Sequence, residues 1–276
     1  MFGPEVYVLS RLRISSVALL FCALLVSPLQ AQNSEQLEVG PPPLHRAAPP
    51  APGASPEELE RRGDELRTDK NFLDAVDFYR AALKGAPGNA SLFNKIGMCQ
   101  LQMHRDKEAK KSFERSIKAD RNHADAYNNL GVTYYDMHSY NAAIKHCERA
   151  ISLRNDVGTY YSNLGAAYFA KKQFEKAIQN YSKAMQLDPD IFERSSHAGV
   201  LAQLASPEDR ARYDYVLAKL YAKTGEPDRS LHYLKKAMEE GYKDIKDVYT
   251  DNEFSALRKD PRFAELMAAK TTVIPD

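Results

Sequence analysis

The chain of 276 residues has no tryptophan, three cysteines and almost no net charge, at +1. Three cysteines are too few for a disulfide scaffold. A balanced charge leaves no electrostatic footprint for nucleic acid or for an anionic membrane surface. The sequence also has no glycine-rich phosphate loop, no CxxC pair and no HExxH motif, so it carries no nucleotide or zinc signature. We expect no nucleic-acid partner, no small-molecule substrate and no cofactor.

Few side chains could carry chemistry of another kind. His138, His146 and Cys147 are too scattered around a turn at Ser139 to converge on a metal. Ser196 and His197 are adjacent, and neighbours on a chain rarely aim at each other as nucleophile and base. We therefore predict no catalytic residue and no metal ligand, which means that the chain is not an enzyme. Cys99 and Cys147 are predicted to be free, buried thiols.

The N-terminus has the three parts of a secretory signal peptide over residues 1–31. Arg11 and Arg13 precede an apolar run over residues 14–26, and small residues lead to Ala31. Cleavage is expected after Ala31, which places the protein outside the cytoplasm, in the periplasm or at the cell envelope of a bacterium. The apolar run is short for a spanning helix, which needs roughly 20 residues. An uncleaved N-terminal membrane anchor stays open as the alternative.

A proline-rich stretch follows over residues 32–55, with almost no apolar side chains to bury. Such a segment cannot recover the entropy lost on ordering. We predict an extended, disordered spacer, with a Pro-rich ligand motif as the less favoured alternative.

Small residues then recur with a period of 34. The glycines are Gly63, Gly97, Gly131 and Gly165, and the alanines are Ala75, Ala109, Ala143 and Ala177. Within one unit the glycine and the alanine lie where two short helices would cross most closely, with aromatic residues around them. The period predicts four helix-turn-helix units, at 56–89, 90–123, 124–157 and 158–191.

The fourth unit reads GTYYSNLGAAYFAKKQFEKAIQNYSKAMQLDPDI, and it closely resembles a tetratricopeptide repeat. The resemblance implies an all-α fold, a right-handed α-solenoid of stacked helix-turn-helix repeats with a C-terminal helical cap. The register breaks after Ile191, so residues 192–210 are interpreted as an insertion and 211–244 as a degenerate fifth repeat. Its first helix is expected to begin early, because Ser206 and Pro207 form a helix-start signal. Residues 245–276 are expected to form the cap and tail.

The resemblance also implies a groove lined by the first helix of each repeat. The residues that we predict to bind a peptide there are Asn94, Met98, Leu101, Asn128, Asn129, Val132, Tyr135, Asn163, Phe169, Tyr215 and Lys219. The apolar members of the middle repeats would form an exposed strip, which usually marks a partner surface; the alternative is packing between neighbouring first helices. Asn129 and Asn163 are candidates for pairing with the backbone of an extended peptide.

These patterns predict a non-enzymatic protein-interaction scaffold of the cell envelope that binds a peptide or helix of another protein in its groove. The alternative is a structural assembly factor packed within a larger envelope or secretion complex. A chaperone-tail clamp of the family needs lysine and asparagine where this chain has Glu60 and Asp64. A partner that ends in a carboxylate is therefore disfavoured at that end.

Overall fold

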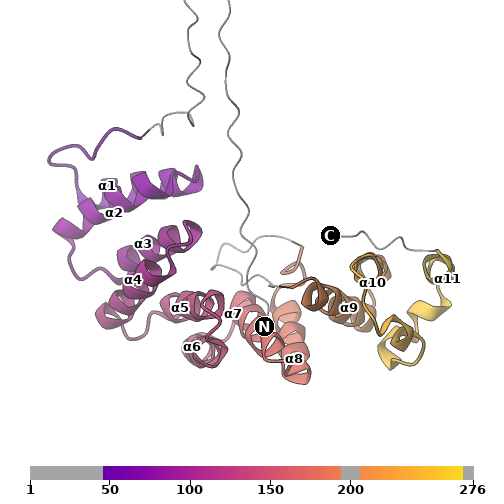
Figure 1. The fold of residues 1–276 in the computed structure, drawn as a ribbon. Coiled ribbons are helices and arrows are strands. Elements are labelled where there is room, and N and C mark those ends of the chain that lie inside the picture. Colours follow the sequence, from indigo (N-terminus) through magenta and orange to yellow (C-terminus); the bar gives the residue numbers. More distant parts are fainter. Residues whose placement is uncertain (1–45, 194–205, 270–276) are drawn as a thin grey trace, which may run out of the picture. The chain divides into compact units, whose positions relative to one another are not determined.

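A computed structural model of the chain describes residues 46–193 and 206–269 (Figure 1). The predicted signal peptide, spacer residues 32–45, most of the insertion and the tail from residue 270 lie outside this part. The described residues form α-helices and short 3-10 helices and no strand, which confirms the all-α prediction. None of the described helices is long and apolar enough to span a membrane.

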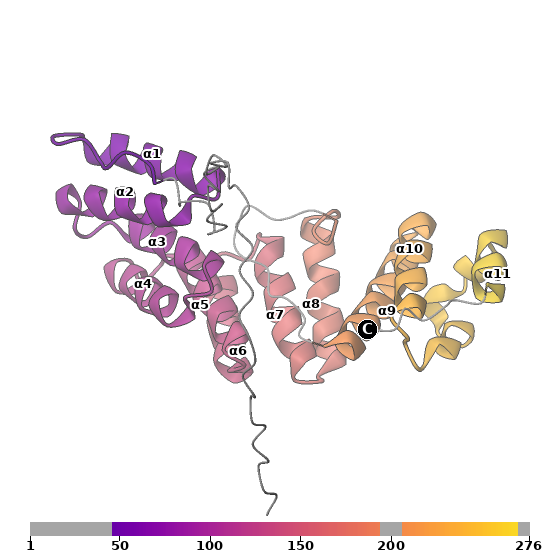
Figure 2. The same cartoon turned by 45° about the horizontal axis from the view of Figure 1, so that its top comes forward.

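The first eight α-helices form four pairs (Figures 1 and 2). They are α1 (Pro56–Thr68) with α2 (Phe72–Gly85), α3 (Ala90–Gln102) with α4 (Asp106–Ala119), α5 (Ala124–Asp136) with α6 (Tyr140–Leu153), and α7 (Gly158–Ala170) with α8 (Phe174–Leu187). The pairs begin 34 residues apart, and the first helix of each has 13 residues. The period of the sequence is therefore the period of the helix pairs.

The remaining helices follow the insertion. They are α9 (Pro207–Thr224), α10 (Pro227–Glu239), the 3-10 helices η1 (Ile245–Tyr249), η2 (Asn252–Phe254) and η3 (Leu257–Lys259), and α11 (Pro261–Ala268). Helix α9 begins early, as its start signal predicts, and has 18 residues. The Ser206 side chain accepts a hydrogen bond from the backbone N–H of Asp209 at 3.1 Å. This cap satisfies a donor that the first turn leaves unpaired.

Two helices of a pair meet at the repeated glycine. A Cβ atom placed on Gly165 would lie 2.6 Å from the Tyr181 ring, and one on Gly131 would lie 2.6 Å from Sγ of Cys147. Real Cβ atoms do not approach heavy atoms so closely, so glycine is required at the crossing. Cys147 takes in its pair the place that Tyr181 takes in the next, as a fully buried apolar residue.

Neighbouring pairs stack through the second helix of one and the first helix of the next. Helix α2 packs on α3, α4 on α5 and α6 on α7, whereas α8 and α9 contact each other far less. The junction is held mainly by rings: Tyr213 of α9 lies 5.4 Å from Tyr181 and 6.1 Å from Phe169, between ring centroids. The sequence therefore departs from the 34-residue period at the same place where the stacking of the helix pairs becomes looser.

The C-terminal segment closes the core of α9 and α10. Phe254, Leu257 and Phe263 are buried in one cluster with residues of α9 and α10. The resemblance to the repeat family implies a charged helix before the Asp260–Pro261 step, but three 3-10 helices precede it here. The Asp260 side chain caps α11 by accepting from the N–H of Arg262 at 3.0 Å. The predicted helical cap is confirmed, with a different backbone before its last helix.

Residues 46–55 differ from the expected free spacer because Arg46 and Ala47 dock on α2. The Arg46 guanidinium pairs with Asp74 and Asp77, and the Ala47 N–H donates to Asp74 at 3.1 Å. Burial of Asp74 opposes its ionisation, yet the hydrogen bonds from Ala47 and Arg46 hold the pKa of Asp74 below its ordinary value. The end of the proline-rich stretch is therefore part of the folded unit.

Candidate functional site

The expected apolar strip on the first helices is not exposed. Leu101, Val132, Tyr135 and Phe169 have at most 6% of their surface accessible, and only Met98 is partly exposed. Leu101 and Val132 share one core cluster with residues of α4 and α5. The exposed strip is therefore wrong for these four residues. They are core residues, and they pack on second helices as well as between neighbouring first helices, the alternative that the sequence offered.

Two aromatic residues of the strip show how this burial arises. The Phe169 ring is enclosed by Phe174 of α8 and Tyr213 of α9, at centroid distances of 5.2 and 6.1 Å. The Tyr135 ring lies 5.4 Å from Tyr140 and packs in a cluster with alanines of α6 and α7. Large rings of α6, α8 and α9 fill the space that would otherwise expose these two side chains to solvent.

The predicted asparagines bond to one another across the repeats. The amide nitrogen of Asn129 donates to Asn94 at 3.1 Å, and that of Asn163 donates to Asn128 at 3.0 Å. Asn128 also donates to Asn129 at 3.2 Å. All four side chains are buried. Their mutual pairing satisfies buried amides, so this row ties α3, α5 and α7 together and offers little to a peptide backbone.

The first helices at the two ends of the repeat array carry charged side chains that form ion pairs within the chain. Lys95 bonds to Glu60 at 2.7 Å and to Asp64 at 2.6 Å. At the other end, Lys219 lies 2.9 Å from Asp251. The buried hydroxyl of Tyr215 also donates to Asp251 at 2.9 Å. Burial first, and then this hydrogen bond, raise the pKa of Tyr215, so it is a neutral structural donor.

The buried thiols of Cys99 and Cys147 are free, as the sequence predicts. Burial raises the pKa of each to about 12, which leaves them as inert thiols at neutral pH. Within residues 46–193 and 206–269, no three His, Cys, Asp or Glu side chains gather in a way that could hold a metal ion.

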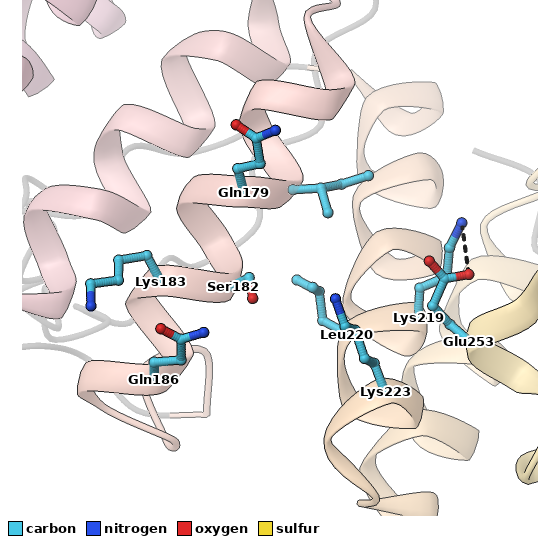
Figure 3. A pocket seen from close by; sticks show the side chains of 9 residues that line it. Gln179, Ser182, Lys183, Gln186, Lys219, Leu220, Lys223 and Glu253 are labelled. Atoms are coloured by element: carbon cyan, nitrogen blue, oxygen red, sulfur yellow. Dashed lines mark ion pairs between the residues drawn. The ribbon is translucent and has the colours of Figure 1, made fainter.

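A cleft opens between α8 and α9, with a volume of about 330 Å³ (Figure 3). Its lining residues are Ile178, Gln179, Ser182, Lys183 and Gln186 of α8, Lys219, Leu220 and Lys223 of α9, and Glu253 of η2. Ile178 is partly buried and supplies the accessible apolar surface, Leu220 is a buried core residue with 4% of its surface exposed, and the other side chains are polar or charged. A concave site with an apolar lining and a few polar groups is the usual form of a binding site.

The cleft exists because α9 does not cover α8 as a regular neighbour would. In the preceding pair, the residues equivalent to Ile178 and Ser182 are Ile144 and Glu148 of α6. There, Tyr168 of α7 closes over α6 and its hydroxyl donates to Glu148 at 2.8 Å. Since α8 and α9 lie apart, this face of α8 remains open between the two helices (Figure 3).

Of the residues predicted to bind a peptide, only Lys219 lines this cleft. The α8 residues fall on the second helix of a repeat, which the family frame does not assign to the groove. The signal that could have found them is the register break itself, because a missing neighbour leaves the last regular helix uncovered. The other predicted groove residues lie on α3, α5, α7 and α9 and do not reach the cleft.

Comparisons with known proteins agree with the repeat. The tetratricopeptide repeat family matches residues 90–123 and 122–190. Residues 90–190 of the chain are tetratricopeptide repeats, and this membership supports a role in protein–protein interaction. The comparison with curated proteins gave no match.

Several solved structures are similar to this chain. A crystal structure of MamA is 27% identical, covering 67% of this chain and 96% of that one, with a TM-score of 0.45. MamA from Desulfovibrio magneticus RS-1 is 15% identical, covering 71% and 97%, with a TM-score of 0.48. YrrB, described as a TPR protein with an unusual peptide-binding site, is 18% identical, covering 70% and 90%, with a TM-score of 0.45.

Proposed function

We propose that this protein is a non-enzymatic scaffold of the cell envelope that binds a peptide or helical segment of another protein between α8 and α9. The repeat family supports the general role. The observation that carries the site is the cleft itself, where apolar surface is accessible next to hydrogen-bonding groups. The inner-helix positions do not offer this combination, since their apolar residues are core and their amides pair with each other.

The polar side chains of α8 in the cleft are available to a partner. Gln179, Ser182 and Gln186 make no side-chain hydrogen bond to any described residue. Amides and hydroxyls can donate and accept, so they suit the backbone of a bound segment. Ile178 of the same helix is partly buried and supplies an apolar contact. A protein segment uses both kinds of surface at once.

The envelope setting is supported by the sequence of residues 1–31. Mass spectrometry of the protein recovered from the envelope fraction should find an N-terminus at Gln32. An intact N-terminus in the membrane fraction would favour the uncleaved anchor, and recovery from the cytoplasm would contradict export.

Affinity capture from the envelope fraction tests the site. Ile178→Glu places a charge on the apolar surface of the cleft, so we expect the partner that the wild-type chain captures to be lost, with little change in melting temperature. The matched control is Tyr249→Glu, because Tyr249 is a large apolar residue with 53% of its surface exposed, outside the cleft.

The two variants separate the two candidate roles. Loss of capture in Ile178→Glu alone supports the cleft. Loss in Tyr249→Glu alone would contradict it and would favour assembly through the C-terminal cap. Capture that survives both changes would also reject the cleft as the binding site.

A further inference from the structure

The charges around the α8–α9 cleft are not balanced. Three lysines and one carboxylate line it, namely Lys183, Lys219, Lys223 and Glu253. Lys219 is compensated, because it lies 2.9 Å from Asp251 and 3.4 Å from Glu253. Lys183 and Lys223 are exposed and form no ion pair with any described residue. The cleft therefore presents two uncompensated positive charges.

These two charges come from opposite walls. Lys183 belongs to α8 and Lys223 to α9, with Ser182 and Leu220 between them in the view of Figure 3. In this view the Lys223 side chain extends toward α8, whereas the Lys183 side chain extends from α8 on the side away from α9. A segment that contacts Ile178 between the helices would therefore pass the Lys223 ammonium group and would reach Lys183 where it continues across α8. Acidic groups along such a segment would be attracted by each lysine in turn, and positive groups would be repelled.

We infer that the segment bound in the cleft is an acidic peptide stretch, with a large apolar residue flanked by aspartates or glutamates. This inference rests on the proposed function and adds the chemistry of the partner. The apolar lining and the unengaged amides Gln179 and Gln186 favour a peptide over a small anion, because a small anion would use the lysines alone. The volume of about 330 Å³ is near the lower limit of ligand sites, about 300 Å³, which suits one inserted side chain.

Three synthetic dodecapeptides provide the probes. The first has a central leucine with two glutamates on each side, the second replaces the glutamates with glutamines, and the third replaces the leucine with serine. Binding is measured by fluorescence anisotropy at low and at high salt. The first peptide should bind about tenfold more tightly than either of the others at low salt. Salt should reduce this advantage over the glutamine peptide, because exposed charge pairs are screened.

A charge reversal of the cleft is the sharper test. Lys183→Glu with Lys223→Glu should weaken the acidic peptide at least tenfold and should gain affinity for the same peptide with lysines in place of glutamates. The control is Lys107→Glu with Lys111→Glu, because these lysines of α4 are also exposed and carry no ion pair with a described residue. It changes the net charge equally and should leave peptide affinity within about twofold.

Three results would overturn the inference: no binding of the acidic peptide, equal loss in the control variant, or tight binding of the serine peptide. Competition by succinate at the affinity of the peptide would likewise indicate an anion site and contradict a peptide. These failures are distinct from failure of the proposed function. If Ile178→Glu abolishes envelope capture while the acidic peptide does not bind, the cleft holds a partner whose chemistry is different.

Discussion

The helices before the insertion and those after it are connected in different ways. Between the regular pairs, a residue of one first helix bonds to the residue 35 positions later: Asn94 to Asn129 and Asn128 to Asn163. Glu60 and Lys95 use the same step, with an ion pair in place of amides. At α9 the series stops, since Ser162 would meet Val216 once the insertion is set aside.

This difference shows how a repeat protein acquires an irregular site. Two kinds of contact hold α1 to α8 in a regular stack. One is the polar contact between first-helix residues 35 positions apart, which we call the polar step, and the other is the close packing of each second helix on the next first helix. At the junction of α8 and α9 the polar step is missing and the two helices contact each other less, and rings such as Tyr213 and Tyr181 contribute to the junction. The regular part supplies a rigid frame, and the departure from it supplies an accessible apolar surface.

The largest expected effect contrasts the two sides of this break. Asn128→Ala removes the acceptor of Asn163 and a donor to Asn129, both buried. A buried polar group that loses its partner costs about 1–3 kcal/mol, so we expect the free energy of unfolding to fall by roughly 2–3 kcal/mol. Ser162→Ala, at the equivalent place in α7, should cost at most about 0.5 kcal/mol. Urea denaturation of both variants measures the difference, and equal losses would contradict a structural role of the amide row.

A second contrast concerns buried polar groups. Helices α3 to α8 bury neutral polar side chains, including the amides, whereas α9 buries the carboxyl group of Asp214, 3% exposed. Burial raises the pKa of Asp214 to about 6, and Lys236 at 3.2 Å only partly offsets this. The ordinary value is about 3.9, so the folded state binds this proton more tightly than the unfolded state. The stabilising contribution is complete below about pH 4 and is lost as the pH rises through about 6.

Asparagine at this position cannot ionise. Asp214→Asn should therefore be more stable than the parent at pH 7, by about 1–3 kcal/mol, and the gain should vanish near pH 4. Urea denaturation of both proteins at four pH values between 4 and 7 gives this difference directly, because all other titrating groups are shared. A variant that is less stable at pH 7 would mean that the ion pair with Lys236 outweighs the cost of burying the charge.

The sequence predicts the fold well because the fold depends on local rules. The repeated glycines, such as Gly131 and Gly165, mark where the two helices of a pair cross. The start signals at Ser55 and Ser206 mark where helices begin. Both rules act between residues that are close together in the sequence. The site depends on which surfaces neighbours leave uncovered. Lys183 and Lys223 are 40 positions apart and line one cleft only because α9 departs from α8, and the repeat frame contains no rule for that departure.

The turns within the pairs give the smallest contrast. Lys70, His104, His138 and Lys172 hold the first four turns with φ between 56° and 61°, whereas Gly225 holds the fifth with φ of 80°. The left-handed region costs an L-residue about 1–2 kcal/mol, and glycine adds about 0.4–1 kcal/mol of unfolded-state entropy. Lys172→Gly should therefore stabilise the regular array by roughly 0.5–1 kcal/mol. Gly225→Ala should destabilise the protein by about 1 kcal/mol. Thermal and urea denaturation check both signs: a loss in Lys172→Gly would show that this exposed lysine makes a stabilising contact that outweighs its backbone strain.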